Sequence, residues 1–320
     1  MTKTLHQAGT VLFSLLCAFS VHAQNNSSIR LIVPFNPGGG SDLFARIIAP
    51  GLSEALKQTV IVENRAGAGG IIGTDIVAKA APDAYTMLLV TTGLSTNPFL
   101  INKLPYNTPQ DFEPITIVGS TPVVLVAHSS LNVRTVKELL ALAKQQPEKL
   151  TFGSSGQGSS GHLSMMLMQR VSGIKFIHVP YKGAGAAIAA IVSGEVNLLF
   201  TAPGVALAQV KANRLRALAV TSAKRVGILP DVPSVVEVGL AGCVVDGWYG
   251  LLAPAGTPKV LIDRIYADLL SVIQQPDVAA RLQGAGFEVE GRPPAQFKRY
   301  LQEEMTRWGT VIKDAGLRTD

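Results

Sequence analysis

Apolar residues recur along this chain with two alternating periods, and that alternation predicts an α/β fold. Residues 31–33 predict a buried strand, and a helical pattern follows it at Leu43, Ile47, Ile48, Leu52 and Leu56. Two further strands are predicted over residues 59–62 and 85–90, with a helix over residues 73–81 between them. Strands that alternate with helices predict a parallel sheet covered by helices. We expect Pro50 and Gly51 to interrupt the first helix, and residues 91–96 to form a hydroxyl-rich loop.

The same alternation restarts near residue 124 and predicts a second lobe. Extended segments over residues 112–118 and 123–127 take the chain across, and residues 248–252 predict the strand that returns. Between them, strands are predicted over residues 150–152, 175–180, 196–200 and 215–220, and helices over 135–145, about 162–171, 186–193 and 204–212. The tail from residue 258 is expected to be mostly helical and to pack on the first lobe. We therefore expect two lobes, each a mostly parallel sheet covered by helices, with residues 24–124 and 247–320 in lobe 1 and residues 125–246 in lobe 2.

The first 23 residues have the pattern of an export signal. Lys3 supplies a weak positive charge, residues 11–19 are apolar, and a small-x-small cleavage pattern ends at Ala23. This apolar core is shorter than the roughly 20 residues that span a bilayer. Leu16 stands where a lipoprotein signal requires a small residue, which argues against acylation at Cys17. We expect cleavage after Ala23, an exported periplasmic protein without a later membrane span, and a monomer.

Composition limits the remaining classes of function. Without the signal, Cys243 is the one remaining cysteine, so we expect no internal disulfide and a fold that depends on its core. The chain has 28 Lys and Arg against 22 Asp and Glu; the signal holds only Lys3, so the mature excess is 27 − 22, or +5. No run of basic residues is interleaved with aromatic ones, which argues against nucleic acid as a partner.

The turn over residues 34–42, Pro-Phe-Asn-Pro-Gly-Gly-Gly-Ser-Asp, predicts an anion site. Glycine has no Cβ, so its N–H groups can converge on a guest, and the helix that follows adds free N–H groups and partial positive charge. If so, we expect Gly39 to need a positive φ or an approach that no Cβ permits. The alternative is an ordinary turn capped by Ser41 or Asp42, with Asp42 paired to Arg46.

A second glycine- and serine-rich turn occupies residues 153–162. Its Gly-x-Gly-x-x-Gly spacing over residues 156–161 matches a dinucleotide fingerprint, but the next strand ends at Tyr181 and Lys182 without the acid that such a site needs. The hydroxyls of this turn around a helix N-terminus suit a carboxylate instead, and they are Ser154, Ser155, Ser159 and Ser160. The alternative is simple capping of the helix by Ser159 or Ser160.

Catalytic and metal-binding patterns are weak in this sequence. Neither Ser155 nor Ser160 lies in a Gly-x-Ser-x-Gly elbow, although an exported serine hydrolase remains the alternative function. We expect His162 to be solvated or capping and His178 to lie in the core. The five histidines are scattered and no acid–histidine spacing suits a metal, so no metal and no cofactor are expected.

Several motifs in order resemble one known family. They are PFNPGGGSD at residues 34–42, VENRAGAGG at 62–70, AKAAPDAYT at 78–86, GSSG at 153–156, HVPYKG at 178–183, RALAVTS at 216–222 and WYGLLAP at 248–254. Together they resemble the Bug family, the extracytoplasmic solute receptors of tripartite tricarboxylate transporters. The resemblance implies a two-lobed periplasmic-binding-protein clamshell that holds a ligand carboxylate between the lobes with loop N–H groups, hydroxyls and bridging waters. It also implies delivery to the membrane subunits of a transporter; a sensor subunit for a signalling partner would share every binding feature.

The turns and the resemblance together define the expected ligand site, whose ligand is a small organic carboxylate. Thr201 stands where many relatives carry an acid, so an amino group on the ligand would lose a partner there. The expected ligand-binding residues are Phe35, Pro37, Gly38, Gly39, Gly40, Ser41, Asp42, Thr92, Ser154, Ser155, Ser159, Tyr181, Lys182, Gly183, Ala184 and Thr201.

Overall fold

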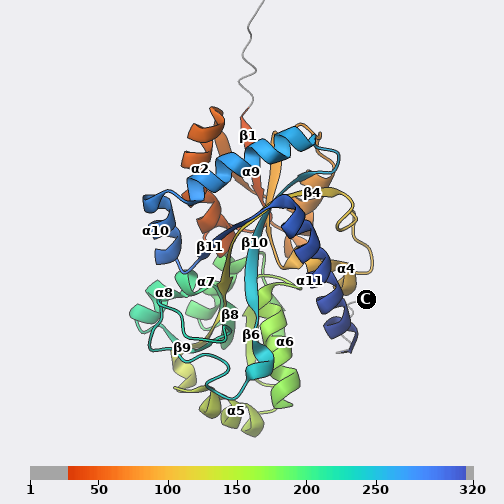
Figure 1. Ribbon diagram of the computed structural model, residues 1–320. Helices are drawn as coiled ribbons and strands as arrows, with labels where there is room; N and C mark the ends of the chain where they lie inside the picture. The colour runs from red at the N-terminus through yellow and green to blue at the C-terminus, as the bar shows by residue number, and fades with distance from the viewer. Residues whose placement is uncertain (1–27, 315–320) are drawn as a thin grey trace, which may run out of the picture.

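Two lobes, each built on its own β-sheet, make up the computed structural model, which describes residues 28–314 (Figure 1). The predicted export signal and its cleavage site lie outside the described residues. Lobe 1 contains strands β1 (Ile29–Val33), β2 (Val60–Asn64), β3 (Thr86–Thr91), β4 (Phe112–Pro122), β10 (Asp246–Pro254) and β11 (Glu288–Arg292), in the order β11-β4-β10-β3-β1-β2. Its helices are α2 (Gly40–Leu56), α3 (Ile71–Ala78), α4 (Gly93–Leu100), α9 (Lys259–Ile273), α10 (Pro276–Gly284) and α11 (Pro294–Asp314), with a 3₁₀ turn at Ala68–Gly70.

Lobe 2 lies between β4 and β10 in the sequence. Its strands are β5 (Val124–His128), β6 (Thr151–Ser154), β7 (Ile177–Pro180), β8 (Leu198–Thr201) and β9 (Leu215–Val220), in the order β7-β6-β8-β5-β9. Its helices are α5 (Val136–Gln145), α6 (Ser160–Ser172), α7 (Ala184–Val192) and α8 (Pro203–Lys211), with 3₁₀ turns at Ser129–Leu131 and Ala241–Cys243. The predicted two-lobed α/β fold is confirmed.

Both sheets are mixed, with their parallel and antiparallel parts in different places. In lobe 1, β1 pairs in parallel with β2 and β3, whereas β10 is antiparallel to β3 and β4. In lobe 2, β6 pairs in parallel with β7 and β8, whereas β5 is antiparallel to β8 and β9. The expected mostly parallel sheets are therefore wrong: the strands that connect the lobes pair antiparallel, and the alternation of strands and helices predicts the direction of the parallel strands only.

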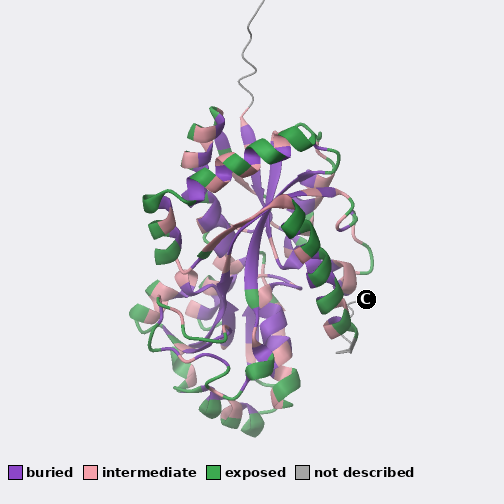
Figure 2. Cartoon of the chain, in the orientation of Figure 1, coloured by how far each residue is buried: buried purple, intermediate pink, exposed green. Residues whose placement is uncertain are grey.

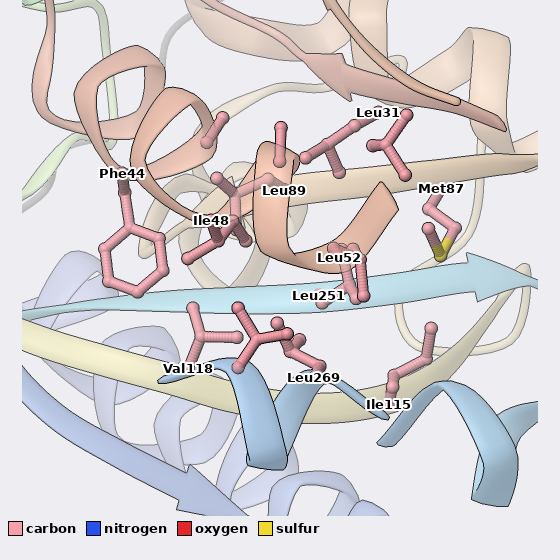
Figure 3. Packing of buried hydrophobic residues seen from close by; sticks show 14 of the residues in the cluster. Leu31, Phe44, Ile48, Leu52, Met87, Leu89, Ile115, Val118, Leu251 and Leu269 are labelled. Atoms are coloured by element: carbon pink, nitrogen blue, oxygen red, sulfur yellow. The ribbon is translucent and has the colours of Figure 1, made fainter. Parts of the chain in front are cut away.

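The central strands are buried on both faces, as strands covered by helices must be. In β3, Met87 and Leu89 belong to the cluster formed with α2, α9 and α10, while Leu88 and Val90 belong to the cluster formed with α3, α4 and α11. Figure 3 shows the first of these clusters, with Phe44 and Leu269 among its labelled residues. Figure 2 shows the burial of residues across the molecule, with buried strands inside and exposed positions on the outer faces of helices.

The chain crosses between the lobes twice, and Thr221 holds the two crossings together. Its hydroxyl accepts from the Val123 N–H at 2.9 Å and donates to the Val245 carbonyl at 2.6 Å. Val123 follows β4 directly and Val245 precedes β10. Both connections therefore lie beside one buried threonine, which makes this the place where the lobes can turn relative to each other.

Three predicted features of lobe 1 are wrong. Helix α2 continues through Pro50, and Gly51 is needed because a Cβ there would lie 2.8 Å from the Val272 side chain of α9. Residues 93–100 form helix α4 where a loop was expected, since Thr92 and Gly93 carbonyls accept hydroxyl hydrogen bonds that hold a first turn. Strand β11 was missed inside the supposedly helical tail; its pairing with β4 joins residues far apart in the sequence.

Within residues 28–314, no helix combines the length and apolar character that crossing a membrane requires. Over the same range, no cluster of three or more His, Cys, Asp or Glu side chains has a metal-binding arrangement.

Candidate functional site

A small pocket lies between the lobes. Its volume is about 50 Å³. Lobe 1 contributes the start of α2, the end of β3 and Tyr249, and lobe 2 contributes the starts of three helices and the end of β8. The lining residues are Phe35, Gly39, Gly40, Ser41, Thr91, Val123, Ser155, Ser160, Gly161, Ala184, Leu199, Phe200, Thr201, Ala202 and Tyr249.

Four helices begin at this pocket, because each follows a parallel strand whose carboxyl end faces the gap between the lobes. Helix α2 follows β1, α6 follows β6, α7 follows β7 and α8 follows β8. The first residues or N-caps of these helices line the pocket: Gly40, Ser160, Ala184 and Ala202. Each helix N-terminus carries partial positive charge and N–H groups without a partner in the helix, so four such ends favour an anion here.

Three of these helices have no side-chain cap. The N-caps of α2, α7 and α8 are Gly39, Gly183 and Ala202, and none accepts a capping hydrogen bond from its helix. Helix α6 differs, because the Ser159 hydroxyl accepts from the His162 N–H at 3.3 Å. The uncapped ends leave their first N–H groups available to a guest.

No acidic, basic or histidine side chain lines the pocket. Its polar side chains are hydroxyls that make no hydrogen bond to another described residue, namely those of Ser41, Thr91, Ser155, Ser160, Thr201 and Tyr249. A guest anion would therefore be stabilised by helix ends and neutral donors, without an opposing charged side chain.

The glycine turn before α2 has a different geometry from the one expected. Gly39 has a φ of −88°, so the expected positive φ is wrong at this position; it occurs at Gly38, with a φ of 84°. The close approach is real, because a Cβ on Gly39 would lie 3.3 Å from the Ala184 Cβ of the opposite lobe. Asp42 caps this turn by accepting from the Gly38 N–H at 3.0 Å, and it pairs with Arg46 at 3.0 Å. The predicted pairing of Asp42 with Arg46 is confirmed, whereas the predicted N-cap role of Ser41 or Asp42 is wrong, because Gly39 is the N-cap and no side chain caps α2.

The lobes touch directly on either side of the pocket. The Asn36 N–H donates to the Lys182 carbonyl at 3.0 Å. The Thr96 hydroxyl donates to the Gly158 carbonyl at 2.9 Å. These two hydrogen bonds join the turn before α2 and helix α4 of lobe 1 to turns of lobe 2, so the structure is a closed form of the two lobes.

The serine-rich turn before α6 is held by its own side chains. The Ser154 hydroxyl lies 2.7 Å from the His178 Nε2 and accepts from the Gly156 N–H at 3.2 Å. The His162 Nδ1 accepts from the Gly158 N–H at 3.1 Å. His162 is buried, so the expected solvated position is wrong, although its ring does cap the turn.

His162 stacks on His178 with ring centroids 4.2 Å apart, and His178 stacks on Phe152 at 4.6 Å. Burial, with a smaller contribution from His178, lowers the pKa of His162 to about 3. Burial also lowers the pKa of His178 to about 4. Both rings are therefore neutral near pH 7, and the neutral His162 ring can accept the Gly158 N–H at its Nδ1.

The predicted site residues divide into those that line the pocket and those that support it. The pocket brings together Phe35, Gly39, Gly40, Ser41, Ser155, Ala184 and Thr201. The others lie in the same turns or next to the lining without forming part of it: Pro37, Gly38, Asp42, Thr92, Ser154, Ser159, Tyr181, Lys182 and Gly183. Of these, Tyr181 donates its hydroxyl to Glu195 at 2.7 Å.

The sequence-based site list missed eight lining residues. Ser160 was weighed as a hydroxyl of the turn, and Tyr249 was placed on the return strand, but neither was assigned to the site. The apolar ones carry no chemical signal, and only the closed arrangement of both lobes identifies them. The missed residues are Thr91, Val123, Ser160, Gly161, Leu199, Phe200, Ala202 and Tyr249.

Comparisons with known proteins agree with this geometry. A protein of Bordetella pertussis named BugT is 33% identical over 99% of this chain and 99% of its own. The structure of MatC from Rhodopseudomonas palustris with bound malate matches with a TM-score of 0.85 and 31% identity, over 89% of this chain and 98% of that one. R. palustris Rpa4515 with adipate matches with a TM-score of 0.87 and 33% identity, over 90% and 97%. The model of the tripartite tricarboxylate transporter family receptor matches residues 44–317. This chain belongs to that receptor family of solute-binding proteins.

Proposed function

We propose that this protein captures a small organic carboxylate in the pocket between its lobes and delivers it to the membrane subunits of a tripartite tricarboxylate-type transporter. One observation supports the ligand class above all others: four helix N-termini meet at a pocket that no charged side chain lines. Uncapped helix ends prefer anions, and hydroxyl groups complete the hydrogen bonds that carboxylate oxygens need. The relatives with bound malate and adipate both hold dicarboxylates, which agrees with this class.

Capture requires movement of the lobes. A volume of about 50 Å³ holds only a few water molecules, at roughly 10–15 Å³ each. An organic acid enters only if the contacts between Asn36 and Lys182 and between Thr96 and Gly158 separate. The two crossings beside Thr221 give the hinge for this movement, so ligand binding selects the closed form from an open one.

A receptor accounts for the pocket better than a hydrolase does. Ser155 and Ser160 line the pocket, but neither hydroxyl contacts a histidine. The His178 Nε2 is hydrogen-bonded to Ser154, and the His162 Nδ1 accepts a backbone N–H. A serine nucleophile needs a base within hydrogen-bond reach, so we propose that the protein binds its ligand without converting it.

The remaining parts of the proposal concern location and organisation. The apolar segment of residues 11–19 and the cleavage pattern that ends at Ala23 support export to the periplasm with cleavage after that residue. We place the lobe boundaries at residues 124–125 and 246–247, close to the two crossings, and we propose a monomer. A sensor role would use the same pocket and differs only in the partner that recognises the closed form.

A thermal-shift screen tests the proposed function. The mature protein is heated with a panel of acids, including succinate, malate, adipate and citrate, and with uncharged analogues such as the corresponding diamides. We expect at least one acid and none of the diamides to raise the melting temperature, because a ligand that binds only the folded form stabilises it by mass action. Each acid that binds is then incubated with the protein and recovered unchanged. A panel in which amides bind as well as acids, or in which an acid is consumed, contradicts the proposal.

A further inference from the structure

Tyr249 is the one tyrosine among the described residues that line the pocket, and its hydroxyl has no protein partner there. The residue is 6% exposed, and its hydroxyl makes no hydrogen bond to another described residue. The ring is fixed on both sides, since it stacks on Phe44 with centroids 5.7 Å apart and meets the edge of Phe287 at 5.2 Å. In a residue this deeply buried the tyrosine hydroxyl usually finds a partner, so this one is positioned to donate to a group that enters the pocket.

The hydroxyl lies at the first residue of α2. A Cβ added to Gly40 would collide with it, so the glycine is what leaves it room. The same Cβ would lie 3.5 Å from the Ala202 Cβ, which places the end of β8 just across the gap. Tyr249 therefore stands where lobe 1 meets lobe 2 over the pocket.

Thr201 supplies a second unpartnered hydroxyl from the opposite lobe. It is the last residue of β8, is 3% exposed, and lines the same pocket. Its Oγ1 is fully buried and has no hydrogen-bond partner among the described residues. Leaving a fully buried polar atom unpaired is costly, and in this pocket that cost falls on the Thr201 hydroxyl.

We propose that Tyr249 is a specificity-determining residue, whose hydroxyl donates to an oxygen atom of the ligand while Thr201 contacts the ligand from the other lobe. This rests on the proposed function, since the ligand is taken to be an organic acid. The oxygen belongs to a hydroxyl, an oxo group or a second carboxylate. Burial raises the pKa of the Tyr249 hydroxyl above its usual range, so it remains protonated and able to donate.

The same lining excludes ligands that carry an ammonium group. An ammonium has only donors and is best paired with a carboxylate, but no Asp or Glu lines the pocket. The four helix N-termini repel it further. We therefore expect the protein to discriminate against amino acids in favour of acids with the same carbon skeleton and no amino group.

Calorimetry on Tyr249→Phe tests the assignment, with succinate, L-malate, adipate and L-aspartate as probes. The substitution keeps both ring contacts and removes only the hydroxyl. We expect it to weaken the tightest-binding of the three acids without an amino group by at least about tenfold. Thr201→Val, which keeps the shape of the side chain, should weaken the same acid in the same direction. The melting temperature of unliganded Tyr249→Phe should not fall, because the lost hydroxyl bonds nothing in the protein.

Tyr85→Phe is the matched control, because the Tyr85 hydroxyl bonds Gln58 at 3.1 Å and lies outside this pocket. It should bind as the wild type does. Wild-type affinity in both Tyr249→Phe and Thr201→Val refutes the assignment while the carboxylate proposal stands. L-Aspartate that binds as tightly as succinate refutes the predicted exclusion of ammonium groups. A wild-type protein that binds none of the four acids refutes the assignment together with the carboxylate proposal.

Discussion

The turn before α2 leaves its helix without a side-chain cap, whereas the turn before α6 caps its helix with Ser159. Both turns follow a parallel strand, both are rich in glycine, and both reach the pocket. In the first, the Asp42 carboxylate accepts a hydrogen bond from the Gly38 N–H. The Ser41 hydroxyl lines the pocket and makes no hydrogen bond to another described residue. In the second, the hydroxyls of Ser154 and Ser159 bond the turn itself, and two stacked histidines support it.

This difference teaches where binding energy can come from. A polar group that already has a protein partner gains little from a ligand, because binding would only exchange one hydrogen bond for another. A group that the fold leaves unpaired gains a full partner. The α2 turn is therefore expected to bind the ligand; in the α6 turn, Ser154 and Ser159 are expected to shape the surface that closes over it, and only Ser155 and Ser160 have hydroxyls left for the ligand.

The largest effect should come from filling the space at the α2 turn. In Gly40→Val, the new side chain collides with the Tyr249 hydroxyl and meets Ala202 across the gap. We expect affinity for the acid identified by thermal shift to fall at least about a hundredfold, which is about 2.7 kcal/mol. Calorimetry measures this loss directly.

Gly227→Ala is its control, since nothing lies within 4 Å of a Cβ at that position. It should leave both affinity and melting temperature unchanged. Full affinity in Gly40→Val would show that the ligand does not approach the start of α2.

The sequence predicts most of lobe 2 and the parallel part of lobe 1, because local patterns determine those elements. Strand β9 over Leu215–Val220 matches the prediction, and helix α5 over Val136–Gln145 begins one residue after the predicted start. Strand β11 was missed because it forms by pairing with β4. Glu288 of β11 pairs with Ser120 of β4, more than 160 residues earlier in the chain. The local sequence around β11 does not indicate a pairing partner so far away in the chain.

The prediction of the site had the same limit: the sequence indicates features that depend on neighbouring residues and does not indicate contacts made only in the fold. Gly39, Gly40 and Ser41 could be found because an uncapped glycine turn before a helix has a recognisable pattern. Ser154 has the same chemistry in sequence, yet His178 occupies its hydroxyl, and only the fold brings His178 there. Tyr249 was missed because a tyrosine within an apolar strand is normally a core residue. Only the position of the opposite lobe shows that this one lines the pocket.

A pair of serine variants separates the two turns, with a smaller expected effect. Ser41→Ala removes a hydroxyl that has no protein partner, so it should weaken acid binding by about tenfold and leave the melting temperature of the free protein unchanged. Ser159→Ala removes the cap of α6, which should cost about 1 kcal/mol of stability and lower the melting temperature by a few degrees. Its affinity should change little. Calorimetry and thermal melts on both variants check the pair, and an affinity loss in Ser159→Ala as large as in Ser41→Ala would remove the distinction between the turns.

The smallest effect concerns pH and belongs to the α6 turn alone. The folded pKa values of His162 and His178, about 3 and about 4, lie below the unfolded value near 6.5, so the unfolded chain binds more protons as the pH falls. The two histidines therefore stabilise the fold fully above pH 6.5, and this contribution is lost as the pH falls towards 4 and 3. We expect the melting temperature to fall by a few degrees between pH 6.5 and 5, measured without ligand.

The variant His162→Asn keeps an acceptor near the Gly158 N–H. Its melting temperature should fall less steeply with pH, because one of the two groups with a lowered pKa has been removed. His128→Asn is the control: His128 lies outside this turn, with its Nδ1 2.7 Å from the Ser130 hydroxyl, so its replacement should leave the slope as in the wild type. Equal slopes in all three proteins would show that the stacked pair does not govern the stability of this turn.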